Sequence, residues 1–184
     1  MAKRSRRRFY KRKSGRWSSN LQEVSNNISA TSDVWSAAET IMTNPIQQPS
    51  LVSQTYTVKN IECSFTIETE GLNDNQQFLE NICCYIMFVP QGMAVTSDYN
   101  LQHPEYIMNY KYLGSPSSEF GYQGSGQPAR VLGQQYQPIK FKTRLSRKLQ
   151  TGDGVILFIK GINQSSNTVT LRLSGLIRWW TKAN

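Results

Sequence analysis

The stretch Ile61-Glu62-Cys63-Ser64-Phe65-Thr66-Ile67-Glu68 alternates apolar and polar side chains without a break. In an extended strand, successive side chains point to opposite faces. The pattern therefore places four apolar side chains on one face and four polar ones on the other, and it is the clearest strand signal in the chain.

The residues just before this strand are apolar in the opposite phase. Tyr56 and Val58 would point away from Ile61 if the strand were regular. A β-bulge adds one residue to one strand of a pair and so restores the phase. We therefore predict a bulge near Lys59 and Asn60.

Six further segments have strand character, and turn residues with loops of very unequal length separate them. They are 82–89, 106–113, 129–132, 139–145, 155–162 and 168–180. This pattern, with no long helix, predicts an all-β fold over residues 54–184, either a sandwich or a jelly roll. The loops 95–104 and 114–126 are expected at one end of the sandwich.

Two of these strands are apolar at consecutive positions, 82–89 and 155–159. Such strands need cover on both faces, from the same chain or from another subunit. Residues 17–53 are rich in Ser, Asn, Gln and Thr and are predicted to be a connector. Within it, Ser36 and Glu39 have capping-box spacing for a short helix, although an extended strand fits nearly as well.

Residues 1–16 form a basic arm without a single acid. A block of like charges with little apolar surface is expected to be disordered until it meets a polyanion. Lys and Arg that neutralise phosphates release counterions, and aromatic rings stack on unpaired bases, so the arm is predicted to bind nucleic acid. A nuclear-localisation signal is a compatible reading. The predicted binding residues in the arm and just after it are Lys3, Arg4, Arg6, Arg7, Arg8, Phe9, Tyr10, Lys11, Arg12, Lys13, Arg16 and Trp17.

The body after the arm is formally neutral but divided along the sequence. Residues 17–120 hold 2 basic and 11 acidic residues, whereas residues 121–184 hold 10 basic residues and 1 acid. We expect the acidic part of one subunit to lie beside the basic part of the next. Lys140, Lys142 and Arg144 alternate with apolar neighbours and are predicted to project from one strand face toward nucleic acid; a solvated face, or ion pairs with Glu62 and Glu68, is the alternative.

An enzyme is not expected. The single histidine, His103, lies in a polar loop, and no phosphate-binding glycine loop, HExxH motif or nucleophile elbow is present. The odd set Cys63, Cys83 and Cys84 suits neither a disulfide framework nor a metal site and is predicted to be reduced and buried. We expect no cofactor and no metal. The longest apolar run has 8 residues, so we expect no membrane partner.

Two adjacent tryptophans, Trp179 and Trp180, must point to opposite faces of the last strand. One suits the core and the other a subunit contact, where Trp is enriched, and both are candidate interface residues.

The start MAKRSRRRFYKRKSGRW, the β-only body, the segment PIKFKTRLSRKLQTGDGVILFIKG and the last strand TLRLSGLIRWW together resemble capsid proteins of circoviruses and related small viruses with circular single-stranded DNA. The resemblance covers the layout of the whole chain. It implies a single jelly roll of eight strands in two packed antiparallel four-stranded sheets, an icosahedral shell, an inward-facing arm that contacts the genome, and assembly in the host nucleus. The expected function is therefore a viral coat protein found in the virion, in a shell of about 60 copies.

Three alternatives remain open from the residues. A coat protein of a small RNA virus or satellite would have the same layout, because the arm here is shorter and less purely arginine than in typical circoviruses. A cellular nucleic-acid-binding protein with a basic tail on a β domain would share the arm. A jelly-roll lectin would share the fold but gives no reason for the arm.

Overall fold

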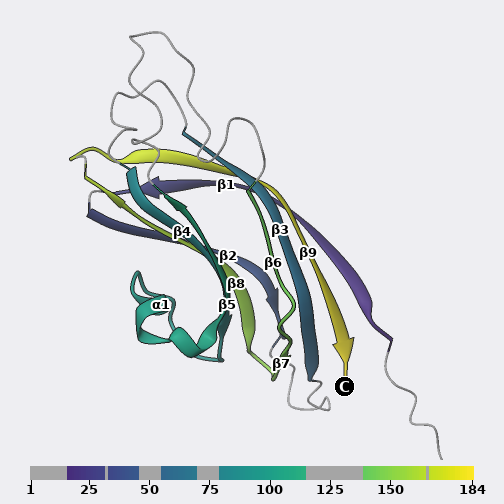
Figure 1. The fold of residues 1–184 in the computed structure, drawn as a ribbon. Helices are drawn as coiled ribbons and strands as arrows, with labels where there is room; N and C mark the ends of the chain where they lie inside the picture. Colours follow the sequence, from purple (N-terminus) through teal and green to yellow (C-terminus); the bar gives the residue numbers. More distant parts are fainter. Residues whose placement is uncertain (1–15, 32, 46–54, 70–78, 115–138, 165) are drawn as a thin grey trace, which may run out of the picture.

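The all-β prediction is confirmed by a computed structural model, which describes residues 16–31, 33–45, 55–69, 79–114, 139–164 and 166–184. Nearly all the regular structure in these ranges is strand (Figure 1). The helical elements there are a single turn, α1 (Tyr99–Gln102), and a 3₁₀ turn, η2 (Pro104–Tyr106). Neither is long and apolar enough to cross a bilayer.

The strands form two antiparallel sheets. The first, here called the β9 sheet, has the order β1-β9-β3-β6, with β7 also paired to β3; the second, the β8 sheet, has the order β2-β8-β4-β5. The β9 sheet contains β1 (Ser18–Ala30), β9 (Val169–Ala183), β3 (Tyr56–Thr69), β6 (Ile139–Thr143) and β7 (Arg147–Leu149). The β8 sheet contains β2 (Asp33–Thr43), β8 (Gly154–Asn163), β4 (Leu79–Val89) and β5 (Ile107–Gly114).

The connectivity is that of a long hairpin rolled on itself. The first strand pairs with the last, β2 with β8, β3 with β6 and β7, and β4 with β5. Successive pairs fall in opposite sheets, and β9 then also pairs with β3 and β8 with β4. This arrangement is a jelly roll, and it places the start of β1 beside the end of β9 (Figure 1).

The predicted bulge in β3 is present. The register between β3 and β9 shifts between Lys59 and Glu62, and Asn60 has a positive φ of 50°. As a result Val58 and Ile61 are both fully buried. On the other side of β3, β6 and β7 pair with residues 61–65 and 56–58 respectively, so their interruption lies opposite the bulge. The sequence did not predict β7, which pairs with β3 on the same side as β6 but beyond the bulge. The β9 sheet therefore has five strands where four were expected.

The connector predicted for residues 17–53 is wrong for residues 18–43, which form β1 and β2. Both strands lie at sheet edges, and β1 buries only Val24, Ile28 and Ala30. Its many polar residues gave it the composition of a linker. Ser36 and Glu39 lie within β2, where no helix forms. Residues 46–53 lie outside the described part, as do the strand predicted at 129–132 and most of the loop 114–126.

The core lies between the two sheets and is filled by the inward apolar residues of both. The largest fully buried side chains include Phe65 and Ile67 of the β9 sheet and Leu157 of the β8 sheet. Trp35 on β2 fits because Gly161 faces it across the β8 sheet. A Cβ at Gly161 would come within 2.6 Å of the Trp35 ring, so a larger residue there would displace the indole.

Candidate nucleic-acid interface

The outer face of the β9 sheet is set by one row of cross-strand neighbours. Leu21 lies opposite Arg178, Arg178 opposite Glu62, and Glu62 opposite Lys142. Directly opposed residues point to the same side of a sheet, so this row fixes the outward set of every strand. Seven basic residues belong to it: Lys59, Lys140, Lys142, Lys148, Arg172, Arg178 and Lys182.

Three acidic residues occupy outward positions of this face: Glu23, Glu62 and Glu68, which lies opposite Arg172 in register. The side chain of Glu68 lies outside the described part. Glu62 lies between Lys142 and Arg178 in register, yet no carboxylate of the described residues comes within 4.0 Å of either cation. The alternative of an ion pair with Glu62 is therefore not realised in this structure. The face keeps a net positive charge that is open to solvent, and such a field attracts polyanions.

Two tryptophans gather at the end of this face where the chain enters β1. The Lys59 ammonium nitrogen lies 3.9 Å from the centre of the Trp17 ring. Trp180, in register between Ser19 and Lys59, is half-buried and has the Arg178 guanidinium carbon 6.0 Å from its ring centre. These four residues, Trp17, Lys59, Arg178 and Trp180, are called the tryptophan cluster below. Their cations lie over aromatic faces, where the attraction is electrostatic.

The structure brings together some of the predicted binding residues. Lys140 and Lys142 are exposed on β6, as the alternation predicted, whereas β6 ends at Thr143 and leaves Arg144 exposed in the turn before β7. Arg16 is exposed beside Trp17 at the start of the described chain. The predicted residues Lys3, Arg4, Arg6, Arg7, Arg8, Phe9, Tyr10, Lys11, Arg12 and Lys13 lie outside the described part.

Several cations of the face were not predicted as a group. Arg172 and Arg178 alternate with buried residues of β9, such as Leu171 and Ile177, and this period of two was readable in the sequence. Lys59 could not be placed in the same way because the bulge changes its phase. Its position on the outer face follows from its pairing with Trp180.

The tryptophan pair divides between the two faces of β9, as predicted. Trp179 is 9% exposed and belongs to the core, whereas Trp180 points outward. Of the two candidate interface residues, Trp180 is therefore the one with substantial accessible surface.

The outer face of the β8 sheet is different in kind. The segment 90–106, which contains α1 and η2, lies against this sheet (Figure 1). Phe158, Ile156 and Met87 point outward from the sheet and are buried beneath that segment. Tyr99 of this segment is 1% exposed and donates a hydrogen bond of 3.1 Å to the Phe88 carbonyl oxygen. The loop 95–104, predicted to decorate one end of the sandwich, instead packs on a sheet face.

This cover accounts for much of the surplus apolar surface that the sequence suggested. The strands around 82–89 and 155–159 are indeed apolar on both faces, but their second face is covered largely from within the chain. The exposed aromatic residues left on the β8 sheet are Tyr110 and Tyr112, which are 63% and 58% exposed. The surplus of apolar residues on these strands therefore does not by itself require a partner subunit.

The topology places one part of the acidic half of the sequence among strands of the basic half. Glu62 belongs to the acidic part of the sequence, yet β3 lies between β9 and β6, which both belong to the basic part. The rolled hairpin interleaves early and late strands, so charges separated along the sequence become neighbours in the sheet. The expectation that the acidic part of one subunit lies beside the basic part of the next stays a prediction.

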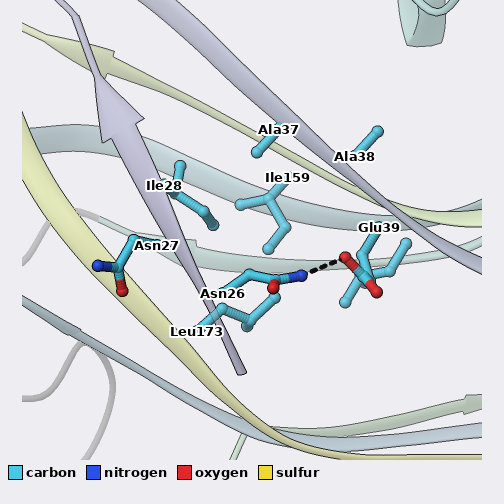
Figure 2. Close-up of a pocket in the computed structure, with 9 residues that line it drawn as sticks. Asn26, Asn27, Ile28, Ala37, Ala38, Glu39, Ile159 and Leu173 are labelled. Atoms are coloured by element: carbon cyan, nitrogen blue, oxygen red, sulfur yellow. Dashed lines mark hydrogen bonds between the residues drawn. The ribbon is translucent and has the colours of Figure 1, made fainter. Parts of the chain in front are cut away.

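A cavity of about 240 Å³ opens at the edge of the sandwich that β1 and β2 form (Figure 2). The Glu39 carboxylate projects toward β1 and accepts hydrogen bonds from the side-chain amides of Gln22, at 3.1 Å, and Asn26. Ile28 and Leu173 supply apolar walls. None of the lining residues is a histidine, cysteine, lysine or arginine, and the polar contacts join the edges of the two sheets.

The three cysteines are buried and free of disulfides, as expected of core residues. Burial raises the pKa of the Cys63 thiol to about 12 and that of Cys84 well above its ordinary value. Thiols with raised pKa values are poor nucleophiles. His103 stacks on Tyr106 and contacts Glu105 at 3.4 Å. The described part of the chain holds no group of three or more His, Cys, Asp or Glu arranged for a metal ion.

Comparison with known proteins finds no match among protein-family models and none among curated proteins. Among solved structures, the VP2 subviral particle of infectious bursal disease virus is similar over 88% of this chain, with 8% sequence identity and a TM-score of 0.24. The chain spans 40% of the length of that protein.

Proposed function

We propose that this chain is the coat protein of a small virus, which assembles into an icosahedral shell and packages a single-stranded genome through its basic arm. The observation that carries the proposal is the continuity of the arm with the β9 sheet. The arm contains nine cations, and the chain leaves it at Arg16 and Trp17, beside an outer sheet face that bears seven more. Arm and face together offer one extended surface for a phosphate backbone.

The binding chemistry follows from charge rather than from base recognition. Each Lys or Arg that neutralises a phosphate releases a condensed counterion, so affinity is insensitive to sequence and falls steeply with salt. In a shell of about 60 subunits, the nine charges of each arm would present on the order of 500 positive charges to the lumen, enough to neutralise a comparable number of phosphates. The β9 sheet then faces the genome. The arm also serves as a nuclear-localisation signal, which suits assembly on a DNA genome in the host nucleus.

Assembly is the decisive test. The purified full-length chain should be treated with nuclease and then examined by size-exclusion chromatography with light scattering, before and after lowering the salt or adding single-stranded nucleic acid. We expect closed, uniform particles under the electron microscope. A stable mass near 21.0 kDa at all concentrations, with no particles, would contradict the coat-protein proposal.

One observation favours a second candidate, a cellular nucleic-acid-binding protein with a basic tail. The segment 90–106 covers the outer apolar residues of the β8 sheet within one chain, so a monomer is not excluded by exposed apolar surface. The same experiment separates the two functions, because this candidate binds nucleic acid as a monomer in soluble complexes of fixed stoichiometry.

A further inference from the structure

We infer that the tryptophan cluster is a seat for one unpaired nucleotide, whose base stacks on an indole of Trp17 or Trp180 while neighbouring cations hold its phosphate. This inference rests on the proposed function, since it names a defined contact within the packaged strand. It goes beyond the charge-driven binding of the arm because it gives the folded body a site that distinguishes a base from bare backbone.

The two indoles lie where a strand of nucleic acid must pass if it follows the arm onto the body. Trp17 directly follows the last arm residue, and Trp180 occupies the neighbouring row of the outer face, opposite Ser19. Trp180 is half-buried although its neighbour Trp179 already fills the core position. The Trp180 indole points outward from the sheet, and part of the ring stays accessible to solvent. Stacking against a base would cover the part of the ring that solvent now reaches.

The positive charge around the indoles favours a phosphate group as the partner over another protein surface. Lys59 is held 3.9 Å from the centre of the Trp17 ring, and Arg178 lies near Trp180. Lys182 and Lys148 stand on either side of Thr57 in the next row. No carboxylate of the described residues lies within 4.0 Å of these four cations. A base next to an indole would therefore have its phosphate within a field of positive charge that lacks local counterions.

A direct test compares a short oligodeoxyadenylate with a strand of the same length in which every nucleotide is abasic. Both carry the same phosphates, so the ratio of their affinities for the full-length, nuclease-treated chain isolates base stacking. The double variant W17L/W180L should lower this ratio about tenfold, because the stacking of one base on an aromatic ring contributes about that factor. The control is Y110L, which removes an exposed aromatic ring from the β8 sheet. It should leave the ratio unchanged.

A second measurement needs no substitution and so does not depend on how the variants fold. A strand that carries 5-iodouracil can be cross-linked to the unmodified chain by light, and the attached peptides identified by mass spectrometry. We expect cross-links at Trp17 or Trp180. Cross-links confined to other aromatic residues, such as those of the arm, would overturn the inference.

The outcomes separate this site from the proposed function. A chain that binds neither strand at low salt contradicts the proposed function itself. A chain that binds both, with a ratio that the double variant does not change, retains the proposed function and loses the nucleotide seat. If the double variant keeps the ratio but fails to form particles, the cluster is a subunit contact instead, and the inference is wrong.

Discussion

The two outer faces of the sandwich are built by the same alternation of side chains but receive opposite residues. In the β9 sheet the outward positions hold cations such as Arg172 and Arg178, and the described chain leaves them open. In the β8 sheet the outward positions hold Phe158 and Ile156, and the chain's own segment 90–106 covers them. The difference indicates which face is available for a partner. A sheet that the chain covers for itself contributes stability, and the face that it leaves bare and charged is the one for which we propose binding.

The cover on the β8 sheet is fastened at both ends. The Arg147 guanidinium donates a 2.6 Å hydrogen bond to the Glu105 carbonyl oxygen, near the end of the segment. At its start, the Asp153 carboxylate accepts hydrogen bonds from the backbone N–H groups of Gln91, at 3.0 Å, and Gln150, at 2.8 Å. These contacts tie the segment to the β7–β8 turn, so the cover is an integral part of the fold.

The largest expected effect concerns the arm that leads onto the β9 sheet. Deletion of residues 1–16 removes nine cations, and the slope of the logarithm of affinity against the logarithm of salt concentration for single-stranded nucleic acid should become shallower by about 6. The described fold begins after these residues, so the circular dichroism spectrum should keep its β character. Fluorescence anisotropy over a range of salt concentrations measures the slope. An unchanged slope would show that the body alone supplies the contacts.

Next in size is the effect of opening the cover on the β8 sheet. Tyr99→Ala removes a buried ring and its hydrogen bond to Phe88, and should lower the free energy of unfolding by about 3 kcal/mol. The control Tyr110→Ala acts on an exposed ring of the same sheet and should cost less than about 1 kcal/mol. Urea denaturation of both variants gives the comparison. Equal losses would mean that the segment 90–106 contributes no more than the surface does.

In the core between the two sheets, the buried Cys63 thiol should make the free energy of unfolding depend on pH at alkaline pH. Burial raises the pKa of the Cys63 thiol from 9.0 to about 12, so the folded chain keeps this proton when the unfolded chain releases it. The stabilisation is complete below pH 9 and is lost as the pH rises toward 12. In that window the free energy of unfolding should fall by about 1.4 kcal/mol per pH unit for this thiol. Cys63→Ala should make the dependence less steep by this amount in denaturation curves measured at several pH values, while the buried Cys84 thiol keeps its own contribution. An unchanged slope in Cys63→Ala would contradict the prediction.

The smallest effect distinguishes single cations on the two faces. Lys142→Gln on the β9 sheet should reduce the salt slope of binding by about 0.7, the contribution of one phosphate contact to a single strand. Lys160→Gln is the matched control, because Lys160 lies on the β8 sheet and pairs with Asp98 at 2.9 Å. It should leave the slope unchanged. If the two variants behave alike, the strand does not select the β9 sheet.

The sequence predicted correctly those features that follow from the alternation of side chains along a single strand. Val58 and Ile61 lie out of phase, and only a bulge reconciles them, so the irregularity at Asn60 could be predicted before the fold was known. Trp179 and Trp180 are adjacent, and their division between core and surface follows from strand geometry alone. Lys140 and Lys142 were placed correctly for the same reason.

The features that failed depend on partners distant in sequence. β1 looked like a linker because an edge strand can be polar on most positions and still gain its hydrogen bonds from β9. Tyr99 sits in a polar stretch, and nothing local shows that its ring covers Phe158. Glu62 comes from the acidic part of the sequence, and only the pairing of distant strands places it between Lys142 and Arg178.

The nested pairing of the strands also determines the order in which the sheets can form during synthesis of the chain. β1 has no sheet partner until residues 169–183 have emerged from the ribosome, because β9 is the strand that pairs with it. Non-local pairings of this kind slow folding and leave strand edges unpaired while the chain grows. The arm is translated first, but the face that continues it takes shape last. The complete binding surface that we propose therefore exists only on molecules whose translation has passed β9.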